Sequence, residues 1–281
     1  MHVLERCRVG RLALQEHELR ARALVDCPLD RIPAGSYDVR AAQRALPAWA
    51  ALPVAERTDY LLALADGIER RFDDFLQAEI GDTGKPVGWA GKIDIPRGAA
   101  NFRTFAELAR TLDMESYMTD TPDGGQALNY AYRKPLGVVG VISPWNLPLL
   151  LLTWKVAPAL AFGNTVIMKP SEVTPSTATL LAEVAGEAGL PAGVLNVVTG
   201  YGAEIGDALV NHPGVDKLSF TGSSQIGKMV GGKATERMAH VSLELGGKSP
   251  CIVFPDSCTD EVVDQVMLAT RFARQSQSCT T

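Results

Sequence analysis

Chemically reactive or ligand-binding side chains follow short apolar runs at five points between residues 144 and 247. The five segments are Pro144-Trp145-Asn146, Lys169-Pro170-Ser171-Glu172, Gly200-Tyr201-Gly202, Thr221-Gly222-Ser223 and Glu244-Leu245-Gly246-Gly247. Each run has the apolar composition of a strand buried in a parallel sheet. Because ligands of such sheets bind outside the carboxyl ends of the strands, we expect the five segments to share one site.

The segment 220–227 has the pattern of a phosphate site. A strand ends in Thr-Gly-Ser and a helix begins, so free backbone N–H groups and the helix dipole favour an anion. Gly222 would let the ligand approach the backbone, and Ser223 can donate its hydroxyl. The usual dinucleotide motif GxGxxG is absent, and an ordinary helix cap with a turn glycine is the alternative interpretation.

Two further strand ends carry groups that suit a nucleotide and a reacting carbonyl. A carboxylate at Glu172, beside Lys169, can bind both hydroxyls of an adenosine ribose and would repel a 2′-phosphate. The amide of Asn146 can stabilise a developing oxyanion. The alternatives are a solvated charge pair for Lys169 and Glu172, and a helix cap for Asn146.

Glu244 and Cys279 are the candidate base and nucleophile. Glu244 ends the strand-like run HVSLEL, where burial would raise its pKa and make it a usable general base. Its alternative is a solvated carboxylate on an edge strand. Cys279 follows a predicted helix, and a lone cysteine is more often a small buried side chain than a nucleophile.

The periodicity of the chain predicts the elements that position these residues. Strands are expected at 137–143, 165–169, 194–199, 217–220 and 240–245. Helices are expected between them, in an apolar segment that ends at Gly163 and at 175–188, 203–211 and 225–234. Five strands alternating with four helices predict an α/β domain with a doubly wound parallel sheet.

The flanking regions have different patterns. Residues 1–37 show no clear period and form an unassigned extension, whereas helical patterns begin at Val39 and cover 54–83 and 94–109. Residues 119–132 contain Pro-Asp-Gly-Gly between β-prone flanks, which predicts a hairpin reaching out of the body. A strand at 250–254 and a helix at 260–273 are expected to open a second domain.

The composition excludes several classes of function. A net charge of −5, from 27 basic and 32 acidic residues, argues against nucleic acid as a partner. The longest apolar stretch, 147–163, contains two prolines and a lysine and is too short to span a membrane. Five cysteines without CxxC spacing and four histidines predict no metal site. Free thiols suit a reducing compartment, so we expect a cytoplasmic protein.

The order of the motifs PWN, KPSE, FTGS, LELGGKSP and QSQSC resembles the NAD(P)-dependent aldehyde dehydrogenase superfamily from Val39 onward. Residues 142–172 look most like the 2-aminomuconate and 2-hydroxymuconate semialdehyde dehydrogenases, with betaine-aldehyde-type enzymes close behind. The resemblance implies a Rossmann-like cofactor domain at 38–117 and 133–247. It also implies an oligomerisation hairpin at 118–132 and the start of a catalytic α/β domain at 248–281.

The resemblance implies oxidation of an aldehyde to a carboxylate. Cys279 would attack the aldehyde carbon, hydride would leave for NAD, and a thioester would remain. Asn146 and the Cys279 N–H would hold the oxyanion, and Glu244 would activate the hydrolytic water. Glu172 favours NAD over NADP. The implied cofactor-binding residues are Ser143, Pro144, Trp145, Lys169, Ser171, Glu172, Gly202, Phe220, Thr221, Gly222, Ser223, Leu245 and Gly246.

Members of that superfamily continue well beyond their catalytic cysteine, whereas this chain ends at Thr281. We therefore expect the N-terminal part of such an enzyme, poorly active by itself, with a homo-oligomer as the full-length form. The alternative is a non-catalytic nucleotide-binding remnant. A CoA-acylating dehydrogenase is a weaker option, because that branch generally lacks the Glu244 base.

Overall fold

The computed structural model describes residues 36–247 and 249–272. Its centre is a sheet of five parallel strands in the order β5-β4-β3-β6-β7. The bounds are β3 Val138–Ile142, β4 Thr165–Lys169, β5 Leu195–Val197, β6 Lys217–Gly222 and β7 His240–Leu245. All five predicted strands are present, and the predicted doubly wound α/β fold is confirmed.

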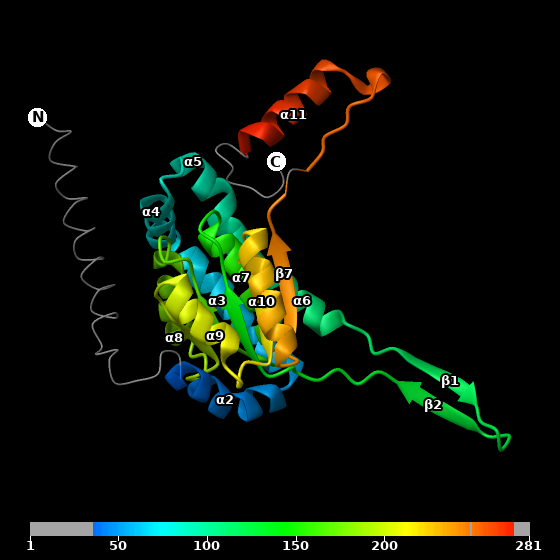
Figure 1. Ribbon diagram of the computed structural model, residues 1–281. Coiled ribbons are helices and arrows are strands. Elements are labelled where there is room, and N and C mark those ends of the chain that lie inside the picture. The colour runs from blue at the N-terminus through cyan, green and yellow to red at the C-terminus, as the bar shows by residue number, and fades with distance from the viewer. Residues whose placement is uncertain (1–35, 248, 273–281) are drawn as a thin grey trace, which may run out of the picture.

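The chain winds outward from β3 in two directions. It runs from β3 to β4 and β5 through helices α7 (Pro148–Ala161) and α8 (Ser176–Glu187). It then returns to β6 and β7 on the other side of β3, through the π-helix η3 (Gly202–Gly206) and helices α9 (Asp207–Asn211) and α10 (Ser224–Glu236). Because parallel crossovers are right-handed, the reversal places the two sets of helices on opposite faces of the sheet. Figure 1 shows the carboxyl ends of the strands pointing to the top of the view.

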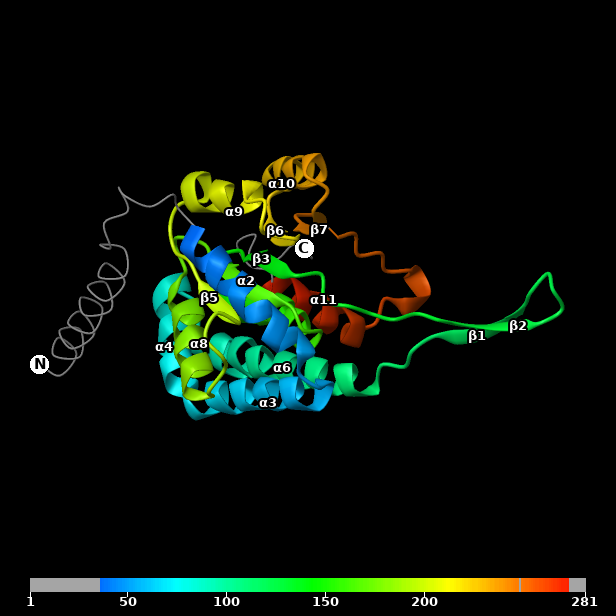
Figure 2. The same cartoon turned by 90° about the horizontal axis from the view of Figure 1, so that it is seen from below.

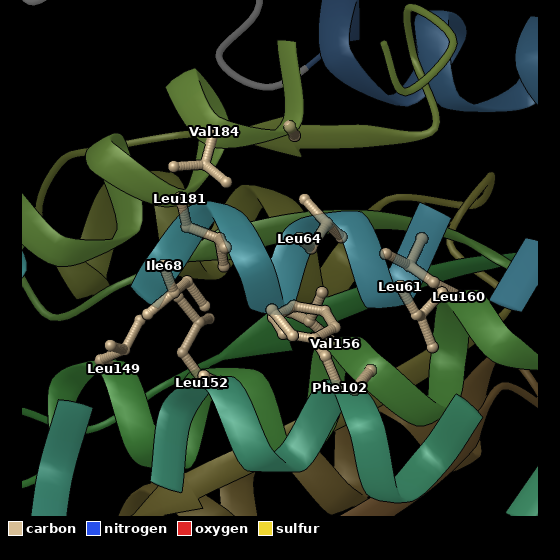
Figure 3. Packing of buried hydrophobic residues seen from close by; sticks show 14 of the residues in the cluster. Leu61, Leu64, Ile68, Phe102, Leu149, Leu152, Val156, Leu160, Leu181 and Val184 are labelled. Carbon is tan, nitrogen blue, oxygen red and sulfur yellow. The ribbon is translucent and has the colours of Figure 1, made fainter. Parts of the chain in front are cut away.

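Successive side chains of the central strands β3 and β4 enter different cores. Val139, Val141 and Met168 belong to a large apolar cluster with α3, α6, α7 and α8. Figure 3 shows the centre of this cluster, where Leu64 and Ile68 of α3 pack against Leu152 and Val156 of α7. The opposite face buries a smaller cluster of residues from α2, the central strands, α9 and α10. Burial on both faces explains why these strands are continuously apolar in sequence.

The N-terminal helix α2 (Ser36–Ala51) packs against β3, β4 and β5. The helices that follow it form a layer on the α7 and α8 side. They are α3 (Val54–Arg70), α4 (Phe72–Thr83), α5 (Val87–Trp89), the π-helix η2 (Ala90–Asp94) and α6 (Ile95–Thr111). The predicted helical run 54–83 is broken at Arg71, which has φ −100° and ψ 28°. As expected, this run ends at Gly84, whose φ of 68° is left-handed. Figure 2 shows α3 and α6 side by side beneath the sheet.

The predicted hairpin is present and extends away from the body (Figures 1 and 2). Strands β1 (Ser116–Asp120) and β2 (Gln126–Tyr130) pair antiparallel from Ser116 with Tyr130 to Asp120 with Gln126. The turn between them uses Gly124 with a φ of 81°, as the Asp-Gly signal predicts. Its large side chains are exposed, Tyr117 by 64% and Leu128 by 63%.

The segment after β7 differs from the sequence prediction. No strand forms at 250–254, because no other described segment pairs with these residues, whose side chains from Cys251 to Phe254 are exposed. A short 3₁₀ turn η4 (Pro255–Ser257) and helix α11 (Asp260–Phe272) follow, and the helix agrees with prediction. Among the described helices, none is long and apolar enough to cross a membrane.

Candidate active site at the carboxyl edge of the sheet

The order in which strands are added to the sheet reverses between β3 and β6. Doubly wound sheets bind their ligands at this switch point, outside the carboxyl ends of the strands. The two strands are paired up to Ile142 with Phe220, so the segments that follow them begin side by side. On the other flank of β3, the Ser143 N–H donates to the Lys169 carbonyl at 3.1 Å. The register therefore brings the predicted segments after β3, β4 and β6 to one edge.

At the end of β4, Lys169 and Glu172 form an ion pair with 3.0 Å between Nζ and Oε2. The lysine side chain is only 3% exposed while the glutamate side chain is 40% exposed, so the solvated pair of the alternative interpretation is wrong for Lys169 and holds for Glu172. The backbone N–H of Glu172 itself and the Lys169 ammonium hold the pKa of this carboxyl below its ordinary value, with help from the Gly202 N–H. Glu172 is thus a carboxylate facing solvent, and it ties the loop after β4 to the loop after β5.

The loop after β3 places Ser143 in the interior, Trp145 half exposed and Asn146 between these extremes. Helix α7 begins at Pro148 and its N-cap is Leu147, which makes no side-chain cap. The capping alternative for Asn146 is therefore wrong. Asn146 lies two residues before α7, in the loop that follows β3 at the switch point.

The end of β6 has the features of an anion site. Ser223 is the N-cap of α10, and its Oγ accepts from the Ile226 N–H at 3.3 Å. The capping interpretation is therefore confirmed. It is compatible with ligand binding at the same helix start. The Thr221 Oγ1 is buried and has no hydrogen-bond partner among the described residues. Such a group is costly unless a ligand or water satisfies it. Gly222 packs against Phe220, because an added Cβ would lie 2.5 Å from the ring Cζ.

Two glycines beside these groups have open space next to their Cα atoms. A Cβ added at Gly202 or at Gly246 would meet no described atom within 4 Å. A lysine, a carboxylate, an unsatisfied hydroxyl and the amide end of α10 surround this edge. This donor set fits a dinucleotide, with the carboxylate toward a ribose and the N–H groups toward its phosphates.

Glu244 is exposed, so the expectation that it is buried is wrong for the described structure. The burial of β7 alternates along the strand, with Val241, Leu243 and Leu245 partly buried and the intervening side chains exposed. The partly buried set packs closely with α10, because a Cβ added at Gly227 would lie 2.3 Å from Leu245 Cδ2. Glu244 therefore points away from α10, on the strand at the edge of the sheet. It is opposite Thr221 of β6 in the register.

Lys155 was not predicted as a site residue, since in the sequence it only interrupts an apolar stretch. This side chain of α7 is 8% exposed and its Nζ donates to the Ser219 Oγ at 3.3 Å. Burial lowers the pKa of Lys155, the charge of Glu244 partly opposes this, and nearby Lys217 adds to the lowering, so that the pKa is about 8. A lysine in an otherwise apolar helix was the available signal. With this pKa, Lys155 can lose its proton near neutral pH. Its side chain lies within electrostatic range of Glu244, the candidate base.

Replacing Lys155 by methionine should stabilise the protein by about 2 kcal/mol below pH 8, because the ammonium no longer has to be buried. The wild-type side chain binds fewer protons folded than unfolded between pH 8 and its ordinary value of 10.5. Wild-type stability therefore rises with pH across this window, and the advantage of Lys155→Met shrinks. Urea unfolding at pH 7, 8.5 and 10 measures this change. Lys228→Met is the control, because Lys228 of α10 is exposed. A stability gain of Lys155→Met that does not vary with pH would contradict the lowered pKa of Lys155.

Other expectations concern residues beyond this edge. Cys279 lies outside the described residues, as do most of the extension 1–37 and Lys248. Cys251 and Cys258 are free thiols and both are exposed. Within the described part, no group of His, Cys, Asp or Glu side chains could hold a metal ion.

Comparison with known proteins assigns the class that this fold and site define. Residues 35–281 match the model of the aldehyde dehydrogenase family, and the chain belongs to that family. The resemblance found in the motifs is confirmed.

The chain is similar to particular members over almost all of its described length. It is 52% identical over 243 residues to the 2-aminomuconic 6-semialdehyde dehydrogenase of Pseudomonas sp., covering 86% of this chain and 49% of that protein. The structure of PnpE in complex with nicotinamide adenine dinucleotide superposes with a TM-score of 0.80 at 43% identity, covering 86% and 49% of the two chains. An Escherichia coli NADP-dependent enzyme has the same TM-score and coverage at 38% identity. The chain thus spans about half the length of the curated relatives it matches.

Proposed function

We propose that this chain provides the cofactor-binding part, and the first catalytic residues, of an NAD-dependent aldehyde dehydrogenase. The observation that supports this most is the Lys169–Glu172 pair at the same sheet edge as the unsatisfied Thr221 hydroxyl and the α10 N-terminus. Glu172 and Lys169 would hold the adenosine ribose. Ser223 and the α10 amides would hold the pyrophosphate, with Ser143, Pro144, Trp145, Ser171, Gly202, Phe220, Gly222, Leu245 and Gly246 lining the crevice.

The proposed chemistry converts an aldehyde and water into a carboxylate. Bound NAD supplies the acceptor for the hydride. The Cys279 thiolate adds to the aldehyde carbon, the Asn146 amide donates to the resulting oxyanion, and loss of hydride leaves a thioester. Glu244 takes a proton from the water that releases the acid. The charge of Glu244 raises the pKa of buried Lys155, so the two side chains lie within electrostatic range of each other.

The muconic semialdehyde dehydrogenases among the relatives suggest the class of substrate. We propose a semialdehyde, an aldehyde that carries a carboxylate elsewhere in the molecule. We propose residues 38–117 and 133–247 as the cofactor domain and 248–281 as the start of the catalytic domain. The exposed hairpin 118–132 would pair subunits of a homo-oligomer. Exposed thiols at Cys251 and Cys258 suit a reducing, cytoplasmic location.

Replacing Glu172 by serine should reduce the preference for NAD over NADP by about tenfold or more, because the carboxylate binds ribose hydroxyls and repels a 2′-phosphate. Isothermal titration of both dinucleotides measures the ratio of dissociation constants. Glu204→Ser is the matched control, since Glu204 is also an exposed acid in the neighbouring η3. Equal effects of the two variants would contradict the ribose contact.

Titration of the 281-residue chain with NAD, followed by thiol labelling of Cys279, tests the function as a whole. We expect NAD to bind and to accelerate labelling of Cys279 relative to Cys251 and Cys258, which serve as internal controls. Binding without any change at Cys279 would favour the non-catalytic remnant. No binding of NAD or NADP would refute the proposed function. Acyl release that Glu244→Gln leaves unchanged would instead favour the CoA-acylating branch.

A further inference from the structure

Two carboxylates on the last turns of α4 reach the starts of two other helices. Glu79 and Asp82 are three residues apart and therefore share one face of α4. The helices they reach, α7 and α8, are those that follow β3 and β4. Each of these helices begins just after one of the loops proposed to hold cofactor and substrate.

Asp82 caps α8 from a distance of 94 residues in sequence. Its Oδ2 accepts from the Ser176 N–H and its Oδ1 from the Ser176 hydroxyl, both at 2.9 Å. The residue at the N-cap of α8 is Pro175, which makes no side-chain cap. A charged acceptor at a helix N-terminus is also favoured by the helix dipole. Asp82 thus determines where the loop 170–175, with Ser171 and Glu172, ends.

Glu79 has the corresponding position at α7. It is fully buried, and its Oε2 accepts from the Leu149 N–H in a long hydrogen bond of 3.4 Å. The helix offers no cap of its own, because Pro148 has no N–H and Leu147 makes no side-chain cap. The loop 144–146, with Asn146, lies directly before this start.

A buried lysine holds the Glu79 side chain in place. Lys85 Nζ lies 3.0 Å from Glu79 and 2.5 Å from Asp94, and all three side chains are at most 5% exposed. Asp94 belongs to the π-helix η2, an irregularity that often marks functional regions. Buried charges are costly unless they are paired and hydrogen-bonded. Packing of the helices alone does not require these three buried charges, whose pairing fixes the position of the Glu79 carboxylate.

We propose that Asp82 and Glu79 are positioning residues for the active site, Asp82 for the ribose-binding loop 170–175 and Glu79 for the Asn146 loop 144–146. This inference rests on the proposed function, because it assigns the two loops to cofactor and substrate. Neither side chain need touch a ligand. Each acts by fixing the helix start at which its loop ends, so that one turn of α4 aligns both halves of the site.

Asp82 gives the sharper test because it is only partly buried. Asp82→Ala removes both bonds to Ser176 and should weaken NAD binding about tenfold. Asp82→Asn should stay within about threefold of wild type, because its amide oxygen still accepts from the Ser176 N–H and its NH₂ can donate to the hydroxyl. Asp73→Ala, on the exposed first turn of α4, controls for loss of an acid from this helix.

Hydrogen exchange of the cofactor-free chain is a second measurement that does not depend on NAD binding. Asp82→Ala should speed exchange at 170–176 and leave 144–150 unchanged, whereas Glu79→Ala, which removes the acceptor of the Leu149 N–H, should do the reverse. If Glu79→Ala does not fold, the Asp82 variants still decide the test. Unchanged exchange at 170–176 in Asp82→Ala, or an equal change in Asp73→Ala, would overturn the inference. Wild-type protein that binds no NAD would instead refute the proposed function, while the exchange result would still decide whether Asp82 positions its loop.

Discussion

Replacing Gly137 by alanine should lower the free energy of unfolding by about 3–5 kcal/mol, the largest effect on stability that we expect from a single added methyl group. Gly137 has a φ of +134°, and a Cβ there would lie 2.0 Å from Oδ2 of Asp216. That carboxylate accepts from the Val138 N–H at 2.8 Å. The new methyl would strain the backbone and displace this acceptor at the start of the central strand. Equilibrium unfolding in urea measures the loss.

Gly186→Ala is the matched control for this substitution. Gly186 lies near the end of α8, and a Cβ added there would meet nothing within 4 Å. Alanine should be neutral or stabilise the helix by up to about 1 kcal/mol. A Gly137→Ala protein within about 0.5 kcal/mol of wild type would show that the start of β3 is not as tightly constrained as described.

Replacing Lys169 by alanine should have the largest effect on cofactor affinity. A buried ammonium that donates to a ribose hydroxyl contributes about 1.5–3 kcal/mol, so the dissociation constant for NAD should rise about 10- to 150-fold. Thermal stability should change little, because the ammonium no longer has to be buried and the Glu172 side chain left behind is 40% exposed. Titration calorimetry and a thermal melt of the same variant separate the two effects.

Lys233→Ala breaks a comparable ion pair away from the site. Lys233 of α10 pairs with Asp207 of α9, and both side chains are partly exposed. We expect this variant to bind NAD with wild-type affinity. A Lys169→Ala protein with the same affinity as Lys233→Ala would remove Lys169 from the cofactor site.

The sequence predicted the strands well because β3 and β4 are buried on both faces and therefore continuously apolar, while apolar and polar residues alternate in β7 at the edge of the sheet. The strands at 165–169 and 240–245 have the bounds that were predicted. The break at Arg71 was missed, since its cause is tertiary: the guanidinium pairs with Glu183 and Glu187 of α8 as well as with nearby Asp74. The strand at 250–254 was wrongly predicted, because an apolar run forms a strand only where another segment pairs with it.

The site was predictable in outline for a topological reason. The carboxyl ends of parallel strands must meet at one edge, so Lys169 and Thr221 come together although 52 residues separate them. Burial at the site was less predictable, as Glu244 and Lys155 show. The roles of Glu79 and Asp82 gave no sequence signal, since a carboxylate that caps a helix 70 or 94 residues away leaves no local pattern.

Hydrogen exchange of the chain with and without saturating NAD tests the central claim most directly, because it locates the cofactor without requiring turnover. We expect protection at 143–147, 169–173 and 220–227, the three segments that the switch point brings together. The distant hairpin at 116–130 should be unaffected. Protection confined to other parts of the chain, or no NAD-dependent change at any segment, would contradict the account.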